Sequence, residues 1–320
     1  MDRREAIGLG LAGALISGAA RAQNETGYLP GDSTEFVKLW PGTPPGGAGI
    51  KLDLKVTDAI QPDGFHVRAV SQIDKPGFFV YRPVKPTGLA LLVIPGGGYA
   101  SEGGDRGGRE IARYFADRGI ISFVLRYRLP GEGWKNREMV PLQDAQRAMR
   151  LIRAGEYGAG RLGVIGFSAG GHLSATLAIR SGMATYDALT PADRGSARPD
   201  IAAHMYPVIT MGEGAHLGSR DKLLGPSPTP QAVADWSLEQ HAGPDTVPSY
   251  LCLAADDDVV PPQPNGMIFF EKLQQAKVPS QLDVFEKGGH GFSLHWAQGK
   301  PCGAWPDLFL AWAATHGFKA

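Results

Sequence analysis

Short apolar segments alternate with helical patterns along most of this 320-residue chain, and this alternation limits the folds open to it. The segments are nearly continuous apolar runs, which is typical of strands buried on both faces of a parallel sheet. We predict strands at residues 78–81, 89–94, 120–125, 162–167, 201–206, 250–255 and 281–285, and helices at 109–116, 142–154, 172–178, 265–276 and 308–316. The pattern predicts an α/β fold, with a mostly parallel central sheet and helices on both faces.

The chain divides by composition into three segments. Residues 1–22 have the features of a signal peptide, because the basic pair Arg3-Arg4 precedes small apolar residues and an A-x-A cleavage pattern at Ala20-Arg21-Ala22. The paired arginines suggest a twin-arginine signal, and the apolar stretch is shorter than the roughly 20 residues that span a bilayer. Residues 23–50 are rich in Gly and Pro, which predicts an irregular segment, and residues 51–320 would form the folded domain. We expect an exported protein, periplasmic or secreted, without a membrane anchor.

Charge and cysteine content argue against several classes of protein. Lys and Arg together number 32, as do Asp and Glu, so the sequence indicates no nucleic acid partner. Cys252 lies inside an apolar run, which favours a buried thiol over a disulfide. A G-x-G-x-x-G pattern at residues 158–163 precedes a predicted strand, the reverse of the order in a dinucleotide-binding loop. Because the sequence also lacks clustered Cys or His, we expect no metal and no organic cofactor.

The most specific motif is Gly166-Phe167-Ser168-Ala169-Gly170, which fits G-x-S-x-G. It lies between the predicted strand at 162–167 and the predicted helix at 172–178. A sharp strand–turn–helix of this kind, called a nucleophile elbow, exposes a serine hydroxyl to a neighbouring base. A serine hydroxyl is a weak nucleophile on its own, so Ser168 needs a base and an orienting acid elsewhere in the chain.

Candidates for these partners follow in the order acid, then base. Residues 256–258 are three aspartates directly after a predicted strand, and we favour Asp257 as the acid that orients the base. His290 follows the last predicted strand and has glycines on both sides, which would let its ring reach across to the serine. We therefore predict a catalytic triad of Ser168, Asp257 and His290.

A glycine run follows the predicted strand at 89–94. Glycines let the backbone approach a substrate without an intervening Cβ. Acyl transfer needs N–H groups aimed at the oxygen on which negative charge develops, and each such donor is worth roughly 2.7–4 kcal/mol in the transition state. We predict that the N–H groups of Gly97, Gly98 and Ala169 form this oxyanion hole.

Further side chains lie near these motifs. Aromatic residues there would stack on a sugar or acyl group, although core or rim packing suits them equally well: Tyr99, Trp134 and Trp296. We expect Asp144 to form a buried, structural ion pair with Arg126 or Arg128. Residues 181–199 and 210–248 lack strand patterns, and insertions of this length usually shape an active site.

Because of these motifs, the chain resembles the α/β-hydrolase fold, and within it the bacterial acetyl esterase and acetylxylan-esterase-like proteins. The resemblance runs from about residue 39 to the C-terminus. It implies ester hydrolysis, with the family's functional residues falling on Ser168, Asp257 and His290. Pro95 stands where hormone-sensitive-lipase-like relatives carry His, which leaves open whether Gly97, Gly98 or Tyr99 supplies the oxyanion donor. The motifs that carry the resemblance are Pro95-Gly96-Gly97-Gly98-Tyr99, Arg126-Tyr127-Arg128-Leu129, Pro141-Leu142-Gln143-Asp144, Gly166-Phe167-Ser168-Ala169-Gly170-Gly171-His172, Tyr206-Pro207-Val208-Ile209-Thr210, Ala255-Asp256-Asp257-Asp258-Val259-Val260-Pro261 and Gly288-Gly289-His290-Gly291-Phe292.

The resulting hypothesis is a serine carboxylesterase that removes short acyl groups, above all acetyl, from plant-type oligo- or polysaccharides such as acetylated xylan. Its partner would be a small-molecule or carbohydrate ester, and the sequence gives no oligomeric state. Three alternatives remain open: a feruloyl esterase or general carboxylesterase of lipase-like activity, a serine peptidase, and a catalytically inactive sugar-binding homologue. A peptidase of the prolyl-oligopeptidase type normally carries a second large domain, for which this chain has no room.

Overall fold

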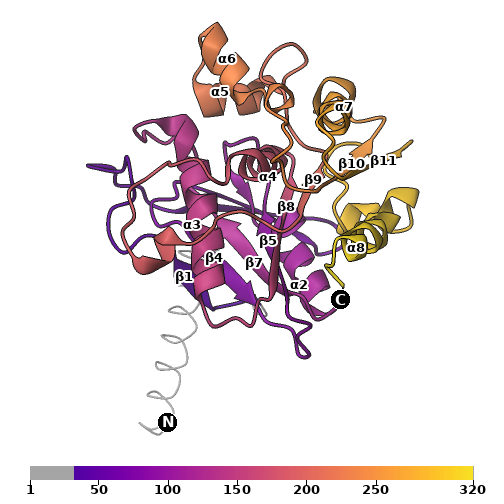
Figure 1. Cartoon of the computed structure of the whole chain (residues 1–320), viewed down its shortest axis with the longest axis horizontal. Coiled ribbons are helices and arrows are strands. Elements are labelled where there is room, and N and C mark those ends of the chain that lie inside the picture. The colour runs from indigo at the N-terminus through magenta and orange to yellow at the C-terminus, as the bar shows by residue number, and fades with distance from the viewer. Residues whose placement is uncertain (1–31, 320) are drawn as a thin grey trace, which may run out of the picture.

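The described residues, 32–319 of this computed structural model, form an eight-stranded sheet in the order β1-β4-β7-β5-β8-β9-β10-β11 (Figure 1). The predicted signal peptide lies outside the described residues. From β7 to β11 every pair of neighbouring strands is parallel, whereas β1 and β4 join antiparallel at one edge. The α/β fold with a mostly parallel sheet is thus confirmed. The strands are β1 (Phe36–Lys38), β4 (Gly77–Tyr81), β5 (Leu89–Ile94), β7 (Ile121–Arg126), β8 (Arg161–Phe167), β9 (Ala202–Met205), β10 (Ser249–Ala254) and β11 (Ser280–Phe285).

Helices cover both faces of the sheet, which explains why the central strands are apolar throughout. Along β5, Leu92 and Ile94 pack on the face that carries α3 and α4, whereas Leu91 and Val93 pack on the face that carries α2 and α8. Successive strand residues point to opposite faces, so both sets must be apolar. The helices are α2 (Glu110–Ala116), α3 (Val140–Ala154), α4 (Ala169–Arg180), α5 (Leu217–Leu224), α6 (Pro230–Trp236), α7 (Ile268–Gln275) and α8 (Trp305–Thr315).

The N-terminal segment departs from the prediction. Residues 23–50 were expected to be irregular, but β1 lies within them and pairs antiparallel with β4. Phe36 packs on Phe79 of β4, with ring centroids 4.8 Å apart, and Leu39 and Trp40 enter the core. A three-residue strand is too short to show a periodic pattern, so only its pairing partner identifies it.

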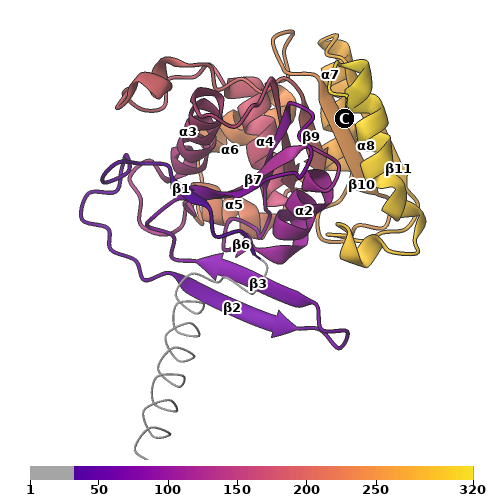
Figure 2. The same ribbon diagram turned by 90° about the horizontal axis from the view of Figure 1, so that it is seen from below.

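A second, three-stranded sheet was also not predicted. It contains β2 (Lys55–Ile60), β3 (His66–Ser71) and β6 (Glu102–Gly103), in the order β2-β3-β6. Figure 2 shows β2 and β3 as a long hairpin beside the main body. Five of the six residues of β2 are exposed and three are polar, so this strand lacks the continuous apolar pattern of the central ones. The hairpin matters because β3 supplies one wall of the cavity described below.

A buried ion pair joins the segment after β7 to α3, as expected, and its cation is Arg128. The Arg128 Nη2 atom lies 2.8 Å from Asp144 Oδ1, and both side chains are 0% exposed. The backbone N–H of Arg128 donates to Asp144 Oδ2 at 2.8 Å, and the Trp40 indole donates to Oδ1 at 2.7 Å. Arg126 lies instead near Glu102, at 3.7 Å. Both Cys252 and Cys302 are buried free thiols, so the expectation for Cys252 is confirmed.

Breaking this pair tests its structural role. Asp144→Asn leaves the guanidinium of Arg128 buried without its counter-charge, which should lower the free energy of unfolding by about 3–5 kcal/mol. Urea unfolding at neutral pH measures the change. The matched control is Glu35→Gln, because the Arg82–Glu35 pair has side chains 52% and 42% exposed. Exposed pairs are worth at most about 1 kcal/mol, so equal losses in the two variants would contradict the assignment.

Candidate active site

Ser168 occupies the turn between β8 and α4 with a backbone that L-residues rarely adopt. Its φ and ψ are 56° and −118°. Neighbouring glycines allow the turn, because a Cβ on Gly166 would lie 2.0 Å from the Gly170 carbonyl oxygen, and one on Gly170 would lie 2.3 Å from that of Ile94. The Ser168 N–H donates to the Met205 carbonyl at 3.0 Å, which ties the turn to the next strand. The geometry is that of a nucleophile elbow.

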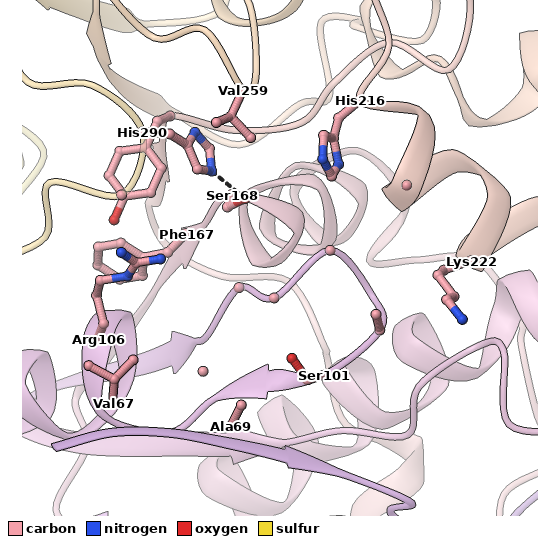
Figure 3. Close-up of a pocket in the computed structure, with 18 of the residues that line it drawn as sticks. Val67, Ala69, Ser101, Arg106, Phe167, Ser168, His216, Lys222, Val259 and His290 are labelled. Atoms are coloured by element: carbon pink, nitrogen blue, oxygen red, sulfur yellow. Dashed lines mark hydrogen bonds between the residues drawn. The ribbon is translucent and has the colours of Figure 1, made fainter. Parts of the chain in front are cut away.

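The structure brings Ser168, His290 and Asp257 together from the ends of β8, β11 and β10. His290 Nε2 lies 2.8 Å from Ser168 Oγ (Figure 3). On the other side of the ring, His290 Nδ1 lies 2.7 Å from Asp257 Oδ2. Because a carboxylate only accepts, Nδ1 carries the hydrogen and Nε2 is the acceptor that faces the serine hydroxyl. This contact scheme gives the histidine the tautomer that a general base requires.

The three adjacent aspartates have different partners, which separates the favoured residue from its neighbours. Asp257 is 6% exposed, and its Oδ1 atom accepts the N–H groups of Val259 at 3.0 Å and Val260 at 2.8 Å. Asp256 accepts the N–H groups of Gly288 and Gly289, at 2.9 and 2.8 Å. The hydrogen bonds to these glycines lower the pKa of the Asp256 carboxyl. Asp256 thus holds the loop that carries the histidine, and only Asp257 contacts the ring.

A cavity of about 440 Å³ opens in front of Ser168. In Figure 3, Val67 and Ala69 of β3 lie across the cavity from Ser168, and Arg106 and Lys222 lie toward opposite ends of it. About half of its lining residues are Gly, Ala or Ser, and the rings of Phe167, Tyr206, His216 and His290 also line it. The residues that line it include Gly97, Gly98, Ser101, Arg106, Phe167, Ser168, His216, Lys222, Val259 and His290.

Two of the predicted oxyanion residues, Gly97 and Gly98, line this cavity, and the third, Ala169, is buried directly after Ser168. The loop after β5 packs directly on the elbow, since a Cβ on Gly96 would lie 2.5 Å from the Phe167 carbonyl oxygen. Gly97 and Gly98 follow with φ of 130° and 64° and line the cavity. Within residues 32–319, the N–H groups of Gly97, Gly98 and Ala169 donate no hydrogen bond. They thus have no acceptor within the described residues, as the predicted role requires.

None of the three aromatic residues considered as substrate contacts lines the cavity, and two of them follow the alternative of core packing. Tyr99 and Trp134 are 1% and 5% exposed and belong to the interior. Trp134 lies over the Arg128 guanidinium at 5.1 Å. Trp296 packs against Arg106, whose guanidinium lies 5.0 Å from the centre of the Trp296 ring. Burial of this kind depends on tertiary packing, which neighbouring motifs do not indicate.

Sequence reasoning missed the polar residues at the edges of the cavity. His216 and Lys222 come from the predicted insertion at 210–248, and Arg106 from the segment before α2. His216 caps α5, because its Nδ1 atom accepts the N–H of Ser219 at 3.2 Å. Burial and the nearby His290 lower the pKa of His216. The predicted insertion at 210–248 indicated a segment near the active site, but its sequence pattern did not identify His216 or Lys222.

Within the described part of the chain, no group of His, Cys, Asp or Glu side chains is arranged to hold a metal ion. No helix between residues 32 and 319 is long and apolar enough to cross a membrane.

A family comparison agrees with this architecture. The model of the alpha/beta hydrolase family matches residues 91–301, a range that contains Ser168, Asp257 and His290. The chain belongs to the alpha/beta hydrolase family. This hydrolase is 31% identical to the acetyl ester-xyloside bifunctional hydrolase of Caldicellulosiruptor lactoaceticus. The two structures match with a TM-score of 0.73, covering 90% of this chain and 98% of that one.

Two curated proteins are also similar to this hydrolase. Endo-1,4-beta-xylanase B of Butyrivibrio fibrisolvens is 36% identical over 211 residues, which are 64% of this chain and 32% of that protein. The acetylxylan esterase of Xylanibacter ruminicola is 28% identical over 222 residues, which are 67% of this chain and 43% of that protein. The chain thus spans less than half the length of each of these relatives.

Buried neutral histidines give the hydrolase a testable response to acid. His204 on β9 is fully buried, with its Nδ1 atom 2.7 Å from Ser174 Oγ, and burial lowers its pKa to about 3. An unfolded histidine titrates near pH 6.5, so the unfolded state takes up the proton first as the pH falls. The contribution of His204 to stability is complete above that pH and is lost progressively toward pH 3.

Between pH 7 and pH 5, we expect His204 to account for about 2 kcal/mol of the loss in unfolding free energy. Urea unfolding of wild type and His204→Gln at both pH values isolates this contribution, because each protein serves as its own reference. The same loss in both proteins would show that His204 does not contribute.

Proposed function

We propose that this chain is a serine carboxylesterase that hydrolyses short-chain acyl esters, chiefly acetyl esters, on plant-type oligo- or polysaccharides such as acetylated xylan. The observation that carries the proposal is the placement of His290 Nε2 2.8 Å from Ser168 Oγ and of His290 Nδ1 2.7 Å from Asp257, beside a cavity. Nucleophile, base and orienting acid in this arrangement support acyl transfer.

In the first half of the reaction, Ser168 Oγ attacks the ester carbonyl carbon while His290 Nε2 takes the hydroxyl proton. Asp257 keeps the ring oriented and stabilises the imidazolium without taking its proton. The carbonyl oxygen, now negative, would accept the N–H groups of Ala169 and of Gly97 or Gly98. The imidazolium then protonates the alcohol oxygen of the sugar, the ester C–O bond breaks, and an acyl-serine remains.

In the second half, water enters where the sugar alcohol has left. His290 removes a proton from this water, and the resulting hydroxide attacks the acyl carbon. The same N–H groups hold the second oxyanion. When it collapses, Ser168 takes back the proton from His290 and the carboxylic acid leaves.

The choice of an acetyl ester on a sugar rests on the cavity and on the relatives. A cavity of about 440 Å³ that must hold the sugar as well as the acyl group suits a small acyl group, and Arg106, His216 and Lys222 in its lining offer hydrogen-bond donors to sugar hydroxyls. The relative from Xylanibacter ruminicola is an acetylxylan esterase, and the similar structure from Caldicellulosiruptor lactoaceticus is that of an acetyl ester-xyloside bifunctional hydrolase. We also propose that the protein is exported, on the strength of residues 1–22.

Replacement of the nucleophile tests the reaction. Ser168→Ala should lower the kcat for p-nitrophenyl acetate by a factor on the order of 10⁶, as loss of a triad nucleophile does elsewhere. Ser181→Ala, at the other end of α4, is the matched control and should keep its activity. A loss of less than about tenfold in Ser168→Ala would refute Ser168 as nucleophile.

A substrate panel tests the ester class. We expect kcat/KM to be higher for acetylated xylo-oligosaccharides than for feruloyl esters or long-chain p-nitrophenyl esters, because the sugar and the acyl group must share a cavity of about 440 Å³. Preference for feruloyl or long-chain esters would favour the wider carboxylesterase alternatives, and cleavage of peptides would favour a peptidase.

A further inference from the structure

A second histidine, His172, lies four residues after Ser168 and takes no part in the contacts of the predicted triad. It is fully buried on the first turn of α4. His172 Nε2 lies 3.0 Å from the Trp236 carbonyl oxygen, and His172 Nδ1 lies 2.9 Å from the Tyr99 hydroxyl. A carbonyl oxygen only accepts, so Nε2 carries the hydrogen and Nδ1 accepts the hydroxyl proton of Tyr99.

The protonation states of the two side chains suit this bond. Burial lowers the pKa of His172 to about 4, and burial raises the pKa of Tyr99 well above its ordinary value. Near neutral pH the imidazole is therefore neutral and the phenol keeps its proton. Both ring nitrogens of His172 have a partner, which a buried imidazole requires.

The backbone at Tyr99 has an unfavourable conformation that surrounding contacts must stabilise. Gly97, Gly98 and Tyr99 have consecutive positive φ angles of 130°, 64° and 57°. A residue with a bulky side chain is strained in that region and stays there only when its surroundings fix it. Tyr99 is 1% exposed, and its ring makes edge contacts with Tyr127 and His172, at centroid distances of 6.3 and 5.8 Å.

The two halves of the predicted oxyanion hole belong to different elements. Ala169 begins α4, whereas Gly97 and Gly98 belong to the loop after β5. The His172 N–H donates to the Ser168 carbonyl at 3.2 Å, so the histidine is one helical turn from Ala169 and moves with it. Tyr99 directly follows Gly98. The Tyr99–His172 bond therefore links the two sets of N–H groups through short, rigid connections.

We propose that Tyr99 and His172 are positioning residues that set the spacing between the two halves of the oxyanion hole. Neither side chain lines the cavity, so they act through the backbone N–H groups of Gly97, Gly98 and Ala169. The Trp236 carbonyl extends the link to α6 and so to the insertion that supplies His216 and Lys222. The inference rests on the proposed esterase function and adds the hydrogen bond that aligns its oxyanion donors.

Tyr99→Phe deletes only the hydroxyl and is the main test. Loss of one oxyanion donor costs about 10²–10³ in kcat, so a misplaced donor should lower the kcat for p-nitrophenyl acetate about 10–100-fold, with KM changed less than about threefold. The matched control is Tyr250→Phe, because Tyr250 is equally buried and its hydroxyl donates to Asp283 at 2.6 Å, away from the cavity. This control should keep the wild-type kcat.

His172 offers a test by conservative rescue. In His172→Gln, the amide can donate to the Trp236 carbonyl and accept from Tyr99, so this variant should retain kcat within about tenfold of wild type. In His172→Phe both bonds are lost, and kcat should fall at least as far as in Tyr99→Phe. Circular dichroism and thermal unfolding show whether each variant is folded at the assay temperature.

The rate at which a fluorophosphonate labels Ser168 provides a readout that needs no ester turnover, because the phosphonyl oxygen occupies the same hole. We expect this rate to fall in parallel with kcat in Tyr99→Phe. An unchanged labelling rate and kcat in folded Tyr99→Phe, or a loss confined to KM, would overturn the positioning role. A wild-type protein that is labelled but hydrolyses no ester would refute the proposed function instead, and the labelling rates would still decide the role of Tyr99.

Discussion

Backbone packed directly on backbone at the Ser168 turn is the constraint on which the site depends. The loop after β5, the end of β8 and the start of α4 meet there, and Gly96, Gly166 and Gly170 leave no space for a Cβ. Any side chain at these positions would push the loop off the elbow, separating the Gly97–Gly98 amides from Ala169. The serine turn, the predicted oxyanion donors and the cavity thus all depend on one close contact.

The parallel sheet explains how distant parts of the chain reach this contact. Ser168, Asp257 and His290 follow β8, β10 and β11, and the carboxyl ends of parallel strands lie at one edge of a sheet. Buried polar contacts stabilise the loop after β5 at the same edge. Tyr127 donates its hydroxyl to the Pro95 carbonyl at 3.0 Å, and the next residue, Arg128, pairs with Asp144 of α3.

The sequence predicted what depends on local pattern and chain order. Buried central strands are continuous apolar runs, so β5 and β8 were located within a residue, and strand-end positions brought Asp257 and His290 into the predicted triad. Three features depend on tertiary contacts and could not be predicted: the short β1, the hairpin of β2 and β3, and the burial of Tyr99 and Trp134. An aromatic next to a motif has the same sequence signal whether it faces the substrate or the core.

The central claim is that Ser168 carries the acyl group between the two halves of the reaction. The most direct measurement is acid quenching during turnover of an acetyl ester, followed by peptide mapping by mass spectrometry. The account predicts a mass gain of one acetyl group on the peptide that contains Ser168, together with a burst of the first product equal to the enzyme concentration. Acetyl bound at another residue, or turnover with neither burst nor adduct, would contradict it.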